Sequence, residues 1–388
     1  MDVRGKIEAN EPSGIETCAP AIIAAPEEPT VGLSRPHEVA GKLSIGKPRP
    51  LELTSIQALR AVAATSVIFA HVPFVNRGGF GVNIFFVVSG FIICYISSVS
   101  PRHFLLKRIF RVVPLYWIGT FGVFFIALVA PHLLNFSTAR PDELLKSLFF
   151  IPFVKESGRA VPLLFLGWTL EYEMFFYLVF AMVLAINKKL AGWLAILALA
   201  GVAIAGSLTH PASLSLKFYS RPIIMEFALG ILAFYLWKSW GQRLNQLSLP
   251  LVALVALACY AIFFWTDNGI PQSIHFVKAI PVFLFQGGLG FVILMCFLST
   301  EGRIPFPRWV LAIGDASYSL YLFHPYIVQL VSKKIVSFDV LTPLSLATLF
   351  ATIGACFLFA IASFVLVERP SNEFLRRTFL SRGKPAAC

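Results

Sequence analysis

The chain has 388 residues, of which 57% are hydrophobic and only 13% are charged, and its mean hydropathy is +0.77. Charged residues make up roughly a quarter of an ordinary soluble protein, so the composition excludes a soluble globular chain and indicates an all-α integral membrane protein. The net charge of +12 does not indicate nucleic acid as a partner, because the positive residues border apolar runs. There they act as topology signals and as contacts to anionic membrane lipid.

Residues 1–50 are rich in Pro, Glu and Ala and contain no sustained apolar run. They lack the apolar region of a signal peptide, so we expect no cleaved leader. Too little apolar surface is present to offset the entropy of ordering the segment. The sequence therefore predicts a disordered cytoplasmic N-terminal tail over residues 1–50.

Ten apolar runs follow, each about 20 residues long, which suffices to cross about 30 Å of hydrocarbon. A further run at 144–153 is about half this length, so we expect it to be re-entrant or interfacial. The sequence predicts about ten transmembrane helices within a membrane domain over 51–370, followed by a basic cytoplasmic tail over 371–388. The ten runs are 55–74, 80–98, 112–131, 163–186, 190–208, 221–240, 247–266, 277–298, 309–331 and 342–367.

The orientation follows from Lys and Arg residues near the ends of the runs. With ten crossings, the basic segments 99–111 and 187–190 and both tails fall on one side. The opposite loops also carry positive residues, so the bias comes mainly from the tails. We expect both termini in the cytoplasm.

The first run contains Arg60 and His71, which are eleven residues apart. At about 100° per residue they emerge from nearly one helix face, ~16 Å apart along the axis. Arg60 could simply snorkel to the membrane surface, and His71 could make a packing hydrogen bond between helices. The functional interpretation is a linear substrate, anionic near Arg60 and reactive near His71, since imidazole takes and returns a proton near neutrality.

The next two runs carry weaker signals. Gly81 and Gly90 favour close helix packing, and Asn83 and Ser89 interrupt the same apolar run. In the segment before the third run, at the expected cytoplasmic border, Arg108 and Arg111 are three residues apart and share a helix face. Two guanidinium groups there could bind phosphates bidentately, although positive-inside charge explains them equally well.

The fourth run contains Glu171 and Glu173, which point about 200° apart around a helix and so cannot face one site. A carboxylate in a span needs a partner such as Arg60 or His71. A carboxylate beside His71 would orient the imidazole and stabilise its protonated form, as in acid–base triads.

Among the later polar residues, Glu226 is expected to lie mid-helix and to have a partner, and Tyr318 and His324 fall in the ninth run. For His324, beside Pro325, we favour a structural histidine that bonds across helices. The six cysteines have no metal-ligand spacing and fit as small apolar packing residues, so no metal site is expected.

These features, in this order, resemble the membrane acyltransferase 3 family over about residues 51–377. Asn83 stands where the family pattern has an acidic residue, which leaves a hydrogen-bonding role there but no proton transfer. The matching positions are Arg60 and His71, Gly81 to Phe91, Arg108 and Arg111, Trp168 with Thr169 and Glu173, Ser317 to His324, and Glu368 with Pro370.

The resemblance implies an integral-membrane O-acyltransferase of the bacterial inner membrane. Its donor would be an acyl-CoA, most often acetyl-CoA, and its acceptor a sugar hydroxyl on a polymeric or lipid-linked saccharide. About 20 residues follow Val367, so we expect the stand-alone type, similar to exopolysaccharide and nodulation-factor acyltransferases. The oligomeric state is left open.

We expect His71 and Glu173 to act in catalysis and Arg60, Arg108 and Arg111 to hold the donor phosphates. Direct transfer and a covalent acyl-enzyme are both compatible with the sequence. Two other classes compete with the enzyme: a transporter or flippase of a lipid-linked saccharide, and a structural subunit of an assembly complex. The expected supporting residues are Asn83, Ser89, Trp168, Glu171, Glu226, Tyr318 and His324.

Overall fold

The computed structural model describes residues 53–72, 75–134, 139–155, 158–209, 211–267, 276–334 and 342–380. The predicted tail 1–50 and the last eight residues of the predicted tail 371–388 lie outside the described residues. Within these ranges the chain is helical, and the β-structure amounts to one isolated bridge between Val154 and Ala160. The predicted all-α class is confirmed.

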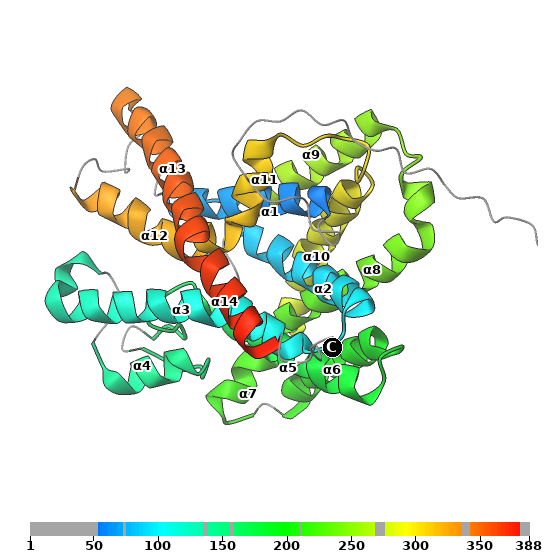
Figure 1. The fold of residues 1–388 in the computed structure, drawn as a ribbon, viewed down its shortest axis with the longest axis horizontal. Helices are drawn as coiled ribbons and strands as arrows, with labels where there is room; N and C mark the ends of the chain where they lie inside the picture. The colour runs from blue at the N-terminus through cyan, green and yellow to red at the C-terminus, as the bar shows by residue number, and fades with distance from the viewer. Residues whose placement is uncertain are drawn as a thin grey trace, which may run out of the picture. The chain divides into compact units, whose positions relative to one another are not determined.

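Helices occupy all ten predicted runs (Figure 1). Among the described residues, seven helices are long and apolar enough to cross a membrane, and Thr54–Phe69 and Phe283–Leu298 are shorter apolar helices. The chain is therefore a multi-pass membrane protein, and the count of ten crossings stays a prediction. The ten helices are α1 (Thr54–Phe69), α2 (Gly81–Val99), α3 (Phe104–Val129), α5 (Gly167–Ile186), α6 (Ala191–Thr209), α8 (Met225–Leu244), α9 (Leu249–Thr266), α10 (Phe276–Leu298), α12 (Ser317–Lys334) and α13 (Pro343–Ser363).

Shorter helices lie between and after these. The run 144–153 coincides in part with α4 (Pro141–Leu148), which at 1.5 Å per residue extends only ~12 Å and cannot cross a bilayer. The others are α7 (Leu214–Tyr219), α11 (Arg308–Asp315) and α14 (Arg369–Leu380).

Several predicted boundaries were wrong. The first helix ends at Phe69 rather than at residue 74, so His71 lies in a turn beyond it. The third helix begins at Phe104 rather than at 112, which places Arg108 and Arg111 inside it. Basic residues continue a helix as well as apolar ones do, so hydropathy marks the apolar part of a helix and not its end. The run 309–331 is divided at Ala316 into α11 and α12.

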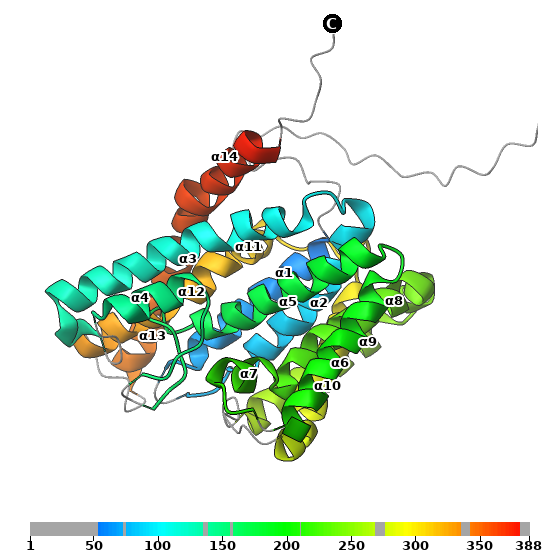
Figure 2. The same ribbon diagram turned by 90° about the horizontal axis from the view of Figure 1, so that it is seen from below.

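Helix α1 is the most enclosed element of the bundle and packs against α2, α10, α11 and α12 (Figure 2). Its first turn is capped from a distant loop, because the Glu301 carboxylate accepts hydrogen bonds from the backbone N–H groups of Thr54 (3.2 Å) and Ser55 (2.8 Å). An anion at a helix N-terminus satisfies free N–H groups and complements the helix dipole. This contact fixes the depth of the helix that carries Arg60.

Glycines bring α2 and α8 into close contact. A Cβ atom added to Gly90 would lie 2.1 Å from the Phe227 carbonyl oxygen, and one added to Gly230 would lie 2.0 Å from the Val87 carbonyl oxygen. Gly81 meets α1 in the same way, with Ala63 O at 2.4 Å from the added atom. The predicted packing role of Gly81 and Gly90 is confirmed.

The helices differ strongly in how much of them the protein encloses. In the most apolar stretch of α2, 61% of residues are buried, whereas the corresponding values are 11% for α9 and 17% for the segment that includes α13. Since exposed apolar residues in a membrane protein face lipid, α9 and α13 form the periphery. The candidate functional residues lie on the enclosed helices.

The last described helix, α14, follows α13 through a π-helical turn, Phe364–Glu368. It packs against the amino-terminal part of α3, where the rings of Phe110 and Phe379 are 5.7 Å apart. Figure 2 shows α14 beyond α3, at the edge of the bundle.

Candidate functional site

An open cavity of about 760 Å³, including its mouth, lies between α1, α2, α3, α5 and α12. Apolar residues of α2 form much of its wall. Six of the predicted site residues, from five helices, line this cavity: Arg60, Ser89, Arg108, Arg111, Glu173 and Tyr318. Its polar and ionisable lining residues are Arg60, Ser89, Arg108, Arg111, Thr169, Glu173, Tyr177, Ser317, Tyr318 and Tyr321.

The charges that line this cavity are unequal, with three guanidinium groups against one carboxylate. Arg60 is only 7% exposed and donates to Gln57 Oε1 at 2.9 Å. Arg108 is 6% exposed, and its Nε atom has no hydrogen-bond partner among the described residues. More guanidinium groups than carboxylates line the cavity, although Asp315 and Glu368 also lie within Coulombic range of Arg60. The lining is therefore suited to an anionic ligand that guanidinium groups can bind through paired hydrogen bonds.

Glu173 belongs to this arginine cluster. Its carboxylate accepts hydrogen bonds from Ser89 Oγ at 3.1 Å and from the Tyr177 hydroxyl. It also lies within Coulombic range of Arg60 and Arg108. Glu368, at the end of the π-helical turn, accepts from Ser319 Oγ at 2.8 Å and lies within Coulombic range of Arg111 and Arg60.

Of the two partners that the sequence offers for this carboxylate, the structure brings Glu173 near Arg60 and not near His71. His71 does not line the cavity and makes no contact with Glu173. The rotation angle between two residues of one helix shows in which directions their side chains point. It does not show which residues of a neighbouring helix lie beside them, and here α5 places Glu173 in the cavity that Arg60 lines. The prediction that Glu171 and Glu173 face different directions is confirmed, since Glu171 does not line the cavity.

The partner of His71 is His324. His324 Nε2 lies 3.2 Å from His71 Nδ1, and the two rings meet edge to face with centroids 4.9 Å apart. His71 Nδ1 is also 3.1 Å from the carbonyl oxygen of Val67, and His324 Nδ1 is 2.9 Å from that of Leu320. His324 is completely buried. The predicted hydrogen bond of His324 across helices is present, and it joins the two histidines into a dyad.

Aromatic residues separate the dyad from the cavity. Tyr321 lines the cavity, shares a 2.9 Å hydrogen bond with Thr169, and places its ring centroid 6.3 Å from that of His324. On the other side, the Phe165 ring meets the His71 imidazole at a right angle, with centroids 6.1 Å apart. One layer of side chains therefore lies between the arginine cluster and the dyad.

Asn83 and Glu226 form a separate buried pair. Asn83 Nδ2 donates to Glu226 Oε1 at 2.6 Å and approaches Gln286 Oε1 at 3.4 Å. The predicted partner of Glu226 therefore exists, but Glu226 lies in the first turn of α8 rather than in mid-helix. Asn83 supplies an N–H donor to the carboxylate where a second acid would repel it.

The remaining predicted supporting residues are Tyr318, Trp168 and Glu171. Tyr318 lines the cavity and donates to the Val112 carbonyl oxygen at 2.8 Å, which ties α12 to α3. The Trp168 ring packs at a right angle against Tyr172. Glu171 is 1% exposed, and neither of its carboxyl oxygens has a hydrogen-bond partner among the described residues.

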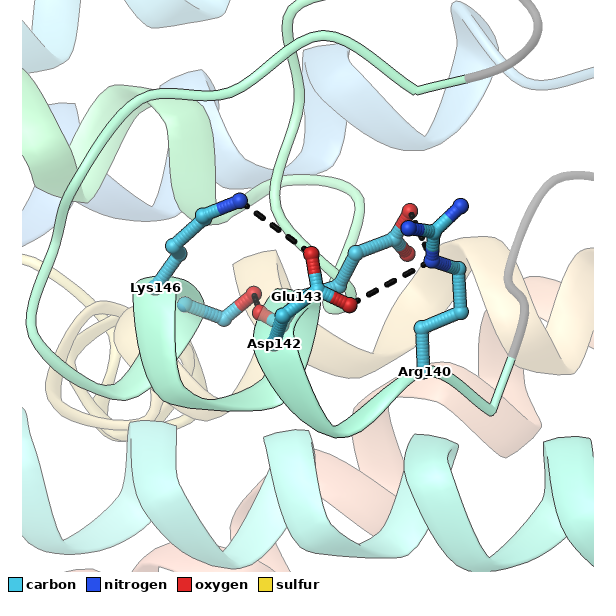
Figure 3. Close-up of polar contacts among 5 residues, drawn as sticks. Arg140, Asp142, Glu143 and Lys146 are labelled. Carbon is cyan, nitrogen blue, oxygen red and sulfur yellow. Dashed lines mark hydrogen bonds and ion pairs between the residues drawn. The ribbon is translucent and has the colours of Figure 1, made fainter.

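The loop after α3 carries α4 and a group of charged side chains (Figure 3). Asp142 pairs with Arg140 (3.3 Å) and Lys146 (3.2 Å), and these pairs hold the pKa of Asp142 below its usual value. Lys155 is 5% exposed, and burial lowers its pKa to about 8 although the negative charge of Glu143 opposes the shift. The described part of this loop therefore combines exposed ion pairs with a buried lysine.

The sequence predicts no role for Tyr177 and no binding role for Thr169, although both line the cavity. A signal for them is present, because Thr169, Glu173 and Tyr177 recur every four residues and so form one polar face on an otherwise apolar helix. Ser317 and Tyr321 also line the cavity, and the sequence marks them only as members of the run Ser317 to His324.

Comparison with known proteins matches residues 53–367 to a family model described as "Acyltransferase domain". The chain is 32% identical to exopolysaccharide production protein ExoZ of Rhizobium meliloti (strain 1021), over 76% of this chain and 89% of ExoZ. It is 26% identical to nodulation protein 10 of Rhizobium leguminosarum bv. viciae, over 70% of this chain and 82% of that protein.

A third relative is the peptidoglycan O-acetyltransferase OatA of Listeria monocytogenes serovar 1/2a (strain ATCC BAA-679 / EGD-e), which is 25% identical over 82% of this chain. The chain spans only 56% of the length of OatA. No solved structure matches the chain.

Proposed function

This chain belongs to the acyltransferase family whose domain model covers residues 53–367 and is an O-acyltransferase, and we propose that it moves an acyl group, most often acetyl, from acyl-CoA to a saccharide hydroxyl. The acceptor is an exported or surface polysaccharide or a lipid-linked glycan. The names of the relatives, which refer to exopolysaccharide production and peptidoglycan O-acetylation, support this acceptor class. Membership in an enzyme family argues against the transporter and structural-subunit alternatives.

The observation that carries the proposal is the cavity lined by an arginine cluster, with a histidine dyad directly behind Tyr321 of its wall. Acyl-CoA has an anionic nucleotide at one end and a thioester at the end of a long, thin arm. We propose that Arg60, Arg108 and Arg111 bind the phosphates, with Glu173 limiting the excess positive charge and Tyr177 and Ser89 fixing the position of Glu173. The arm then extends towards Tyr321 and the dyad.

In the reaction, His71 accepts the proton of the acceptor hydroxyl as its oxygen attacks the thioester carbonyl. A carbon–oxygen bond forms, the carbon–sulfur bond breaks, and the proton passes from His71 to the departing thiolate. Holding both substrates in one site converts a bimolecular encounter into an effectively unimolecular step. We place the donor on the cytoplasmic side of the inner membrane, together with both termini, and the acceptor on the side of α4.

The first test is mass spectrometry of surface polysaccharide from cells that lack this protein, complemented with the native chain or with His71→Ala. We expect the native chain alone to restore one acyl mass per modified repeat, because the proposal assigns the base to His71. The identity of the restored mass names the acyl group.

The matched control is His103→Asn. His103 is exposed, lies outside the site and has a left-handed backbone conformation (φ 53°) that asparagine tolerates. This variant should restore acylation fully. Polymer that is missing or shortened in the deletion strain, with its acyl content unchanged, would overturn the proposal in favour of transport. Full acylation with His71→Ala would remove His71 from the mechanism.

A further inference from the structure

We propose that His324 is a positioning residue that holds His71 in the tautomer protonated at Nδ1, which leaves Nε2 as the base. This inference rests on the proposed function, in which His71 moves the proton. It adds a second residue to the reaction centre, from a helix more than 250 positions away in the sequence.

The assignment follows from what each neighbouring atom can do. A backbone carbonyl oxygen only accepts hydrogen bonds. His324 Nδ1 lies 2.9 Å from the Leu320 carbonyl oxygen, and we assign the hydrogen of that ring to this nitrogen. A neutral imidazole has one N–H group, and therefore His324 Nε2 is an acceptor.

The same reasoning assigns the tautomer of His71. Its Nδ1 atom lies 3.1 Å from the Val67 carbonyl oxygen and 3.2 Å from the accepting Nε2 of His324. Both neighbours are acceptors, so Nδ1 carries the hydrogen and shares it between them. The lone pair of His71 then resides on Nε2, and the imidazole is held by two hydrogen bonds in a single tautomer and orientation.

The surroundings explain why a histidine, rather than a carboxylate, holds this position. His324 is completely buried, and no ion pair reaches either ring within the described part of the chain. A buried carboxylate at this point would carry a large desolvation cost, whereas a neutral imidazole offers an acceptor without a net charge. The single carboxylate of the nearby cavity remains with the arginines instead.

The proton balance is simple. His71 Nε2 takes the proton from the acceptor hydroxyl and later gives it to the thiolate, and the Nδ1 hydrogen stays on His71 throughout. No proton passes to His324. Its contribution is to keep the lone pair on the correct nitrogen and to stabilise the imidazolium by accepting its Nδ1 hydrogen bond.

Two polar substitutions test this with little change in volume. In His324→Gln the amide oxygen reaches about as far from the backbone as Nε2 and can still accept from His71. In His324→Asn the amide is shorter and reaches only the region of Nδ1. Transfer is measured in membrane vesicles with labelled acetyl-CoA and, as acceptor, polysaccharide purified from the deletion strain, with rates divided by the amount of folded protein.

We expect His324→Asn to lower kcat by roughly 10- to 100-fold, a share of the 10²- to 10⁴-fold that a positioned acid–base group contributes. His324→Gln should recover most of this loss. The KM for acetyl-CoA should change little in both variants, because the arginine cluster is untouched. Gln329→Leu provides the control, since it removes a hydrogen bond of the same helix to the Leu133 carbonyl oxygen, away from the dyad.

A combined substitution separates positioning from independent catalysis. If His324 acts only through His71, then His324→Asn should have no further effect in a His71→Ala background. A normal kcat for His324→Asn, or equal losses in the Gln and Asn variants, would overturn the proposal. If the native protein transfers nothing from acetyl-CoA, the donor assignment fails instead, and the two results are distinguishable in one experiment.

Discussion

Single residues account for much of what the site can do, and the arginine cluster is the clearest case. Arg60, Arg108 and Arg111 reach one cavity from two helices, and the carboxylate of Glu173 offsets only part of their charge. The sequence indicated all three arginines, because charged residues inside apolar runs are expensive and rarely incidental. It could not indicate their depth relative to Glu173, so the partner of that carboxylate stayed open between Arg60 and His71.

The first residue-scale prediction concerns Arg108. We expect Arg108→Ala to raise the KM for acetyl-CoA by roughly 10- to 100-fold, since a charge-assisted hydrogen bond contributes about 1.5–3 kcal/mol and 1.4 kcal/mol corresponds to tenfold. Steady-state kinetics at saturating acceptor measures this. Arg243→Ala, which removes an exposed arginine at the end of α8, should have no effect. An unchanged KM in Arg108→Ala would exclude Arg108 from the donor site.

The histidine dyad shows what sequence reasoning cannot supply at this scale. His71 was identified from its position in an apolar run, and the hydrogen bond of His324 was expected, but the two were not connected. They are 253 residues apart, and their contact depends on how deeply α1 and α12 sit relative to each other. Periodicity along one helix contains no information about that depth.

At the scale of helices, hydropathy predicted where elements exist but not where they end. Every predicted run contains a helix, because about 20 apolar residues in lipid must satisfy their backbone hydrogen bonds internally. The ends depend on local contacts instead. Helix α1 starts where Glu301 caps it, and α11 and α12 are separated at Ala316, neither of which affects average hydropathy.

Helix packing gives the second prediction. Gly90 and Gly230 allow α2 and α8 to approach so closely that a methyl group on Gly90 would overlap the Phe227 backbone. We expect Gly90→Ala to lower the yield of folded protein and its thermal midpoint, since main-chain atoms cannot move aside. Size-exclusion chromatography in mild detergent with a thermal ramp measures both.

The matched control for this prediction is Gly122→Ala on α3, where an added Cβ atom meets nothing within 4 Å. It should behave as the native protein does or be slightly more stable, because alanine favours the helix over glycine. If Gly90→Ala and Gly122→Ala unfold at the same temperature, close packing of α2 on α8 is not what stabilises this pair.

For the whole molecule, the excess of buried positive charge links folding to ligand binding. A ligand that binds only the folded state stabilises it by RT ln(1 + [L]/Kd), which is about 2.7 kcal/mol at 100 Kd. We expect CoA to raise the thermal midpoint of the purified protein, and pantetheine, which lacks the nucleotide phosphates, to have little effect. Arg108→Ala should reduce the shift. Equal protection by CoA and pantetheine would contradict phosphate binding by the arginines.

The same cavity also has a consequence for turnover. Acyl transfer changes the thioester end of the donor and leaves its phosphates intact, so the arginines would hold the spent carrier about as firmly as the loaded one. The free thiol carrier would then compete with the loaded donor for the arginines, and the enzyme would be inhibited by its own product. The rate of acylation in the cell would follow the ratio of acylated to free carrier rather than the concentration of the donor alone.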